Sequence, residues 1–137
     1  MSEHPGLGDW IAGKKFMVVE DVDTSRMLVS GLLRGMGAHW VTTAVNGDDA
    51  LEKMEKRGVP DVMICDWVMP GMDGLALLSV VKQLHPQVKF VMLTGQTDAE
   101  HVRQAAHFKV DGYMAKPFSR QGLVDTLTKL MLKEQGA

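Results

Sequence analysis

The chain has 137 residues, the usual size of one domain, and its 45% hydrophobic and 23% charged residues are typical of a globular protein. Its 15 Lys and Arg against 17 Asp and Glu give a formal net charge of −2, which argues against a duplex-DNA-binding domain and a polybasic membrane-surface protein. A single cysteine excludes an internal disulfide, no apolar run approaches the roughly 18 residues of a membrane span, and the first residues lack a secretory signal, so we expect a cytoplasmic protein.

The N-terminal segment precedes the regular pattern of the chain. We expect residues 1–13 to form a tail and residues 14–137 to form the domain. Trp10 and Ile11 in this segment are compatible with two arrangements, one docked on the surface of the domain and one loose. The sequence leaves both open.

The rest of the chain alternates short apolar runs with amphipathic helical patterns. Strands are predicted at residues 16–19, 39–44, 62–65, 90–93 and 112–115. Helices are predicted around the apolar residues of 29–36, 50–54, 77–84, 102–106 and 123–131. Asn46 and Ser119 are suitable N-caps for the second and fifth of these helices. Three of the strands are apolar throughout, and five strand–helix repeats predict a parallel, doubly wound α/β sheet covered by helices on both faces.

Polar side chains follow the strands of this predicted sheet. Ligands of open α/β sheets bind outside the carboxyl ends of the strands, so the residues at these ends are the candidates for function. They are Glu20 and Asp21 after the first strand, Asp66 after the third, Thr94 at the end of the fourth and Lys116 after the fifth. One acid at a strand end means little, because chains reach the surface there. Three acids, a hydroxyl and a lysine from four segments indicate a functional site.

The chemistry of these residue types favours phosphoryl transfer. Three carboxylates brought together repel one another, and a hard divalent cation with oxygen ligands relieves the repulsion. Mg²⁺ suits a site with few carboxylates and several waters. A carboxylate can also attack phosphorus to form an aspartyl phosphate. Lys116 and Mg²⁺ would neutralise the phosphoryl charge, and the Thr94 hydroxyl could donate to a phosphoryl oxygen.

Four segments carry recognisable motifs. The most specific is DWVMPGMDG at residues 66–74, and the others are the acidic pair 20–21, Thr94-Gly95 and GYMAKPF at residues 112–118. Together they resemble the receiver domains of two-component response regulators, over about residues 14–134. Trp67 beside the acceptor position and the lack of an output module in the sequence make the chain most similar to single-domain, CheY-like chemotaxis regulators.

The resemblance implies both a topology and a metal site. The fold would be a flavodoxin-like or CheY-like (βα)5 sheet of five strands in the order 2-1-3-4-5. Asp66 would accept the phosphoryl group. Asp21, Asp66 and the backbone carbonyl of Val68 would ligate Mg²⁺, and Glu20 would act mainly through water.

The resemblance also implies a switch. Lys116 would pair with the phosphoryl group and precede a cis bond to Pro117. Thr94 would move toward the phosphoryl group, and Tyr113 would turn inward as space opens. This movement would change the face formed by the fourth predicted helix, the fifth strand and the fifth helix. Tyr113 as a plain core residue is the alternative.

The function implied is that of a phosphoacceptor signalling protein, which catalyses only its own phosphorylation and dephosphorylation. Its partners would be a histidine kinase or histidine phosphotransfer protein and a downstream effector protein. Chemotaxis signalling by a monomer is the expected role. A phosphorelay shuttle or phosphate sink between histidine proteins is the alternative within the family, and the sequence does not separate the two.

Two other functions are weighed against this one. A pseudo-receiver would bind partners without phosphorylation, but the complete set of acids, threonine and lysine argues against it. Residues 21–24, Asp-Val-Asp-Thr, also resemble the D-x-D-x-T motif of haloacid-dehalogenase-type phosphatases, in which Asp21 would be the nucleophile and Asp23 the general acid. The phosphatase hypothesis leaves the Asp66 segment without a role.

Neighbours of the motif residues have simpler expected roles. Met69 and Met72 are expected to pack within their loop, since Met adapts to irregular gaps. Cys65 lies in an apolar strand and is expected to be a buried, inert thiol. Trp67 is expected to be partly exposed near the site.

Overall fold

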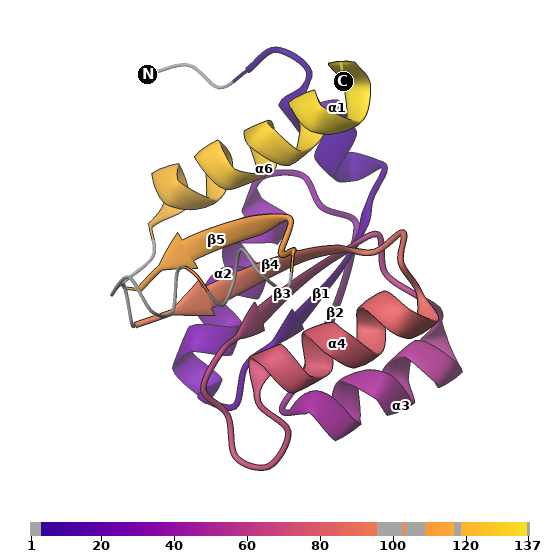
Figure 1. The fold of residues 1–137 in the computed structure, drawn as a ribbon. Helices are drawn as coiled ribbons and strands as arrows, with labels where there is room; N and C mark the ends of the chain where they lie inside the picture. The colour runs from indigo at the N-terminus through magenta and orange to yellow at the C-terminus, as the bar shows by residue number, and fades with distance from the viewer. Residues whose placement is uncertain (1–3, 96–102, 104–108, 117–118, 137) are drawn as a thin grey trace.

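A computed structural model of the chain describes residues 4–95, 103, 109–116 and 119–136. Five parallel strands form one sheet in the order β2-β1-β3-β4-β5, with helices on both faces (Figure 1). The strands are β1 (Lys15–Val19), β2 (Trp40–Ala44), β3 (Val62–Asp66), β4 (Lys89–Thr94) and β5 (Gly112–Ala115). The described helices are α1 (Leu7–Ala12), α2 (Asp23–Gly35), α3 (Gly47–Arg57), α4 (Gly74–Leu84) and α6 (Arg120–Gly136).

The observed sheet confirms the predicted fold class and strand order. Each predicted strand agrees with the observed one to within one residue at either end. The helices predicted around residues 29–36, 50–54, 77–84 and 123–131 correspond to α2, α3, α4 and α6. The remaining predicted helix, around residues 102–106, falls outside the described residues except for Arg103.

Side chains of the central strands alternate between two apolar layers because successive residues of a strand point to opposite faces. In β1, Phe16 and Val18 pack toward α1, α2 and α6, while Met17 and Val19 pack toward α3 and α4. All four are at most 1% exposed. A central strand of this sheet therefore needs apolar residues at every position, and its polar residues come where the strand ends.

Local signals in the sequence account for the helix ends. The Asn46 side chain accepts a hydrogen bond from the Asp49 N–H at 2.7 Å, and the Ser119 hydroxyl accepts one from the Gly122 N–H at 3.0 Å. Both residues act at the positions predicted from the sequence. Asp73 caps α4 by accepting from the Ala76 N–H at 2.9 Å, a cap that the sequence analysis did not single out. Among the described residues, no helix has the length and apolar character needed to cross a membrane.

The N-terminal segment takes the docked arrangement, the first of the two that the sequence left open. Leu7, Trp10 and Ile11 of α1 are buried in the apolar layer shared with α6, and Figure 1 shows α1 beside the C-terminal part of α6. At the edge of this contact, Trp10 Nε1 donates to Glu134 Oε2 at 3.3 Å and Lys14 forms a 2.7 Å ion pair with the same carboxylate. Helix α1 is therefore part of the core.

Truncation of a buried α1 side chain should destabilise the whole domain. For Ile11→Ala we expect the free energy of unfolding to fall by about 2–5 kcal/mol, the usual cost of an Ile→Ala cavity in a core. Urea denaturation followed by circular dichroism measures this change. Asp9→Ala, on the exposed side of the same helix, is the control and should cost much less. Equal stabilities for Ile11→Ala and the wild type would show that α1 is not docked in solution.

Candidate functional site

The sheet register brings the ends of four strands to one edge. Val19 of β1 pairs with Cys65 of β3, and Thr94 of β4 pairs with Ala115 of β5. One residue beyond β1, the Glu20 N–H still donates to the Ala44 carbonyl at 3.0 Å. Each candidate residue thus lies at the end of the ladder or one or two residues past it.

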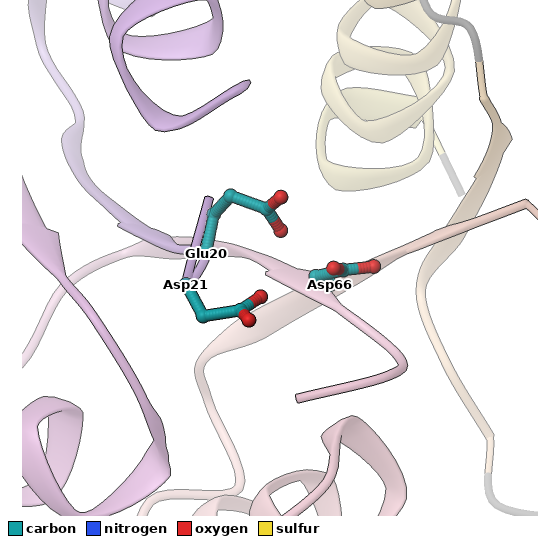
Figure 2. A group of neighbouring side chains, drawn as sticks. All are labelled: Glu20, Asp21 and Asp66. Atoms are coloured by element: carbon teal, nitrogen blue, oxygen red, sulfur yellow. The ribbon is translucent and has the colours of Figure 1, made fainter. Parts of the chain in front are cut away.

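The three acids predicted to converge do lie together. One carboxylate oxygen from each of Glu20, Asp21 and Asp66 lies within 4.8 Å of the other two. Figure 2 shows the Glu20 and Asp21 side chains leaving the end of β1 on the side that faces Asp66. Glu20 and Asp66 are buried, at 0% and 5% exposure, whereas Asp21 is exposed. We call Glu20, Asp21 and Asp66 the acidic cluster.

Lys116 brings the opposite charge from β5. Its Nζ lies 3.1 Å from Asp66 Oδ2 and 3.3 Å from Glu20 Oε1. Burial disfavours the charged ammonium, but the hydrogen bond and charge of Asp66, together with those of Glu20, outweigh burial and raise the pKa of Lys116 above its usual value. Lys116 is therefore a fixed positive charge against three carboxylates.

Glu20 holds the least favourable position in the acidic cluster. Burial, followed by the hydrogen bond and the negative charge of Asp66, raises its pKa to about 7, although Lys116 acts in the opposite direction. Its Oε2 atom is buried and has no hydrogen-bond partner in the described part of the chain. A buried carboxylate oxygen without a partner is costly, because it has lost water and gained nothing in exchange.

This donor set fits a hard divalent cation. Mg²⁺ binds through one or two carboxylates and keeps several waters, and the acidic cluster supplies oxygen ligands and excess negative charge. The unpartnered Glu20 Oε2 is an independent sign that the cluster is incomplete without a further positive group. The Val68 carbonyl as a ligand stays a prediction, and Val68 itself is exposed.

The two predicted switch residues lie on neighbouring strands. Thr94 is 1% exposed at the end of β4, and its carbonyl accepts from the Lys116 N–H at 2.7 Å. Tyr113 is partly buried and packs against the apolar layer on the α3 and α4 side. Their movements stay predictions. Pro117, and with it the predicted cis bond, lies outside the described residues.

The loop after Asp66 is held by backbone contacts. The Trp67 N–H donates to the Leu93 carbonyl at 2.8 Å, and the Gly74 N–H donates to the Trp67 carbonyl at 2.7 Å. A Cβ atom at Gly74 would lie 2.6 Å from the Asp66 carbonyl oxygen, so only glycine fits this close approach. Gly74 is the last residue of the motif at residues 66–74, and this close approach is the physical reason for a glycine there.

Three expectations about the neighbours of Asp66 have different outcomes. Trp67 is only 5% exposed, so the expectation of partial exposure is wrong: its ring joins the apolar layer on the α3 and α4 side. Met69 is buried in the same layer, and Met72 packs against it, as expected of loop packing. Burial raises the pKa of the Cys65 thiol well above its usual value, which agrees with an inert thiol.

The structure does not support the phosphatase hypothesis. That hypothesis needs Asp23 beside Asp21 as a general acid. The Asp23 side chain is 79% exposed and forms an ion pair with Arg26, while the acid that lies near Asp21 and Glu20 is Asp66. Arg26 itself was missed by the sequence analysis, although its position three residues after Asp23 on a helix is a signal for such a pair.

Comparisons with known proteins agree with this site. Residues 16–128 match the family model of the response regulator receiver domain. Chemotaxis protein CheY-3 of Vibrio cholerae is 35% identical over 118 residues, which are 85% of this chain and 90% of that protein. The transcriptional regulatory protein YesN of Bacillus subtilis, described as uncharacterized, is 32% identical over 82% of this chain and 32% of its own length. The solved structure of V. cholerae CheY4 is 31% identical with a TM-score of 0.77, covering 85% of this chain and 97% of that one.

The raised pKa of Glu20 predicts a pH-dependent stability in the absence of metal. The pKa of Glu20 is about 7 in the folded protein and 4.5 for a free glutamate side chain, so the folded state binds more protons than the unfolded state between these two pH values. The free energy of unfolding should therefore fall as pH rises from about 4.5 to about 7. Glu20→Gln removes the charge, so this variant should be more stable than the wild type at pH 8.

Urea denaturation at pH 5 and pH 8 in the presence of a chelator measures this difference. Glu55→Gln, which removes an exposed carboxylate in α3, is the matched control and should leave the pH dependence unchanged. A Glu20→Gln variant that is less stable than the wild type at pH 8 would contradict the assignment of Glu20 as the strained acid.

Proposed function

Because the chain belongs to the response regulator receiver domain family, we propose that it accepts a phosphoryl group on Asp66 from a histidine kinase or histidine phosphotransfer protein and then controls a partner protein. The observation that supports this most directly is the position of Asp66. Its carboxylate ends β3, is buried among two further acids and lies 3.1 Å from the Lys116 ammonium. These are the groups that phosphoryl transfer to a carboxylate needs.

In the proposed reaction the carboxylate of Asp66 attacks the phosphorus of a phosphohistidine. The new O–P bond forms as the N–P bond breaks, and the imidazole leaves with the electron pair of that bond. Lys116 is already within ion-pair distance of Asp66 and would pair with the transferred oxygens, which reduces the repulsion between the carboxylate and the phosphoryl group. The Thr94 hydroxyl would donate to a phosphoryl oxygen.

Asp21 and Asp66 would hold Mg²⁺ directly, with the Val68 carbonyl as a third protein ligand and Glu20 acting through water. When bound, Mg²⁺ would supply positive charge that offsets the repulsion between a phosphoryl group and the carboxylates. Glu20 then favours its charged form, because a nearby cation lowers the pKa of a carboxyl group.

The structural change caused by phosphorylation would pass from Lys116 and Thr94 to β5. The hydrogen bond between the Lys116 N–H and the Thr94 carbonyl supports such a coupling, since it joins the two residues through the backbone. Movement of Thr94 and Tyr113 would change the surface that includes β5 and α6. We propose that this surface binds the partner of the phosphorylated protein, which acts as a cytoplasmic monomer.

The proposed role predicts specific labelling of Asp66. With Mg²⁺ and a small phosphodonor, the wild type should take up one acid-stable, base-labile phosphoryl group, and Asp66→Asn should take up none, because an amide is not a nucleophile toward phosphorus. Mass spectrometry of the intact protein measures the uptake. Asp48→Asn, which changes an exposed acid in α3, is the control and should be labelled normally. If Asp66→Asn is labelled and Asp21→Asn is not, the phosphatase hypothesis replaces this one.

The choice between effector control and phosphorelay depends on the partners. The similarity to CheY-3, a chemotaxis protein, supports effector control. We expect a pull-down with the protein held by fluoroberyllate, a phosphoryl mimic, to retain a partner that the untreated protein does not. Asp66→Asn with fluoroberyllate is the control. Retention of histidine-containing phosphotransfer proteins alone, regardless of the mimic, would favour the relay or sink role instead.

A further inference from the structure

Arg26 is a second cation beside the acidic cluster, and the proposed function gives it no role. It lies in the first turns of α2, and its side chain is only 16% exposed. One arm of its guanidinium, Nη1, donates to the backbone carbonyl of Glu20 at 2.9 Å. The other arm, Nη2, forms an ion pair with the Asp23 carboxylate. The planar guanidinium therefore joins the end of β1 to the start of α2.

The carbonyl of Glu20 needs such a partner. The β1 ladder ends at Val19, which pairs with Ala44 on one side and Cys65 on the other. One residue further, the Glu20 N–H still donates to Ala44, but its carbonyl lies beyond the ladder in a residue that is 0% exposed. A buried backbone carbonyl requires a donor, and Arg26 supplies it from another element.

This contact also sets the direction of Asp21. The Glu20 carbonyl and the Asp21 N–H belong to one planar peptide group. A hydrogen bond to the carbonyl therefore also restrains the orientation of the Asp21 backbone. Asp21 is exposed, and within the described part of the chain its carboxylate has no hydrogen bond or ion pair. Its position in the acidic cluster is therefore set by the backbone, and Arg26 contacts that backbone at the Glu20 carbonyl.

We propose that Arg26 is a positioning residue of the acidic cluster, which holds the peptide between Glu20 and Asp21 in the geometry that binds a divalent cation. The inference rests on the proposed function only in taking this cation to be Mg²⁺. Arg26 suits the role because its guanidinium binds two acceptors with one rigid plane.

Geometry and charge make opposite predictions for the loss of Arg26. As a nearby positive charge, Arg26 opposes cation binding, so its removal would tighten Mg²⁺ binding if charge alone mattered. As the donor that holds the Asp21 peptide, its removal would weaken binding. The sign of the change in affinity therefore separates a positioning role from a purely electrostatic one.

The test is calorimetric titration with Mg²⁺ alone. For Arg26→Ala we expect the Kd to rise about 10-fold or more, the usual effect of removing a group that orients a metal ligand. Arg26→Lys can still donate one hydrogen bond to the Glu20 carbonyl but not two in one plane, so its Kd should lie between those of the wild type and Arg26→Ala. Arg34→Ala is the matched control and should bind like the wild type. Arg34 lies on the same helix and also donates to a backbone carbonyl, that of Val41 at 3.3 Å, but at the far end of α2.

A second readout needs no metal. In the presence of a chelator, the amide hydrogens of residues 21–22 should exchange with solvent faster in Arg26→Ala than in the wild type. In Arg34→Ala their exchange rates should equal those of the wild type. Should Arg26→Ala fail to fold, Arg26→Lys and Asp23→Ala carry the same test, because Asp23→Ala removes the second acceptor of the guanidinium at an exposed site.

If Arg26→Ala binds Mg²⁺ as tightly as the wild type or more tightly, the inference on Arg26 is wrong. The proposed function then stands as long as Asp66 is still labelled. A wild-type protein that binds no Mg²⁺ and is not labelled would overturn both. The two failures are thus distinguishable by the wild type alone.

Discussion

Repulsion among three carboxylates at one sheet edge is the constraint on which the rest of this structure depends. Glu20 and Asp66 are buried within reach of each other and of Asp21, and Lys116 supplies one positive charge against them. The unpartnered Glu20 Oε2 and the raised pKa of Glu20 are two consequences of the same imbalance. A cluster of like charges that lowers the stability of the folded protein is typical of a functional site, because functional residues are selected for their chemistry and not for stability.

The scaffold tolerates the acidic cluster because its backbone is held rigidly around it. Two apolar layers bury β1, β3 and β4 from both faces, so the strand ends cannot spread apart to relieve the repulsion. At the edge itself, hydrogen bonds beyond the ladder hold Glu20, Trp67 and Lys116, and Gly74 lets the chain return close to Asp66. Arg26 extends this restraint to the peptide before Asp21. The site is thus organised before any cation or phosphoryl group arrives, which reduces the cost of binding either.

Helix α1 shows how a family fold is adapted in this chain. The family match begins at residue 16, and α1 lies before it, yet Leu7 and Ile11 are fully buried against α6. Under the proposed function, α6 contributes to the partner-binding surface, and α1 contacts the C-terminal part of α6 through Trp10, Lys14 and Glu134. The family match accounts for the five-stranded sheet, and the N-terminal helix lies before the residues of that match.

The sequence by itself determined the five strands, their parallel arrangement and the residues that meet at the edge of the sheet. Apolar runs are local signals, and in a doubly wound sheet the carboxyl ends of parallel strands must lie at one edge, so Asp66 and Lys116 could be placed together from their positions in the chain. Only the tertiary structure decided that Trp67 is buried, that α1 docks and that Arg26 reaches the Glu20 carbonyl. These features depend on contacts between segments whose distance and direction no local pattern encodes. A side chain is buried or paired according to what packs against it, and that partner comes from another element of the fold.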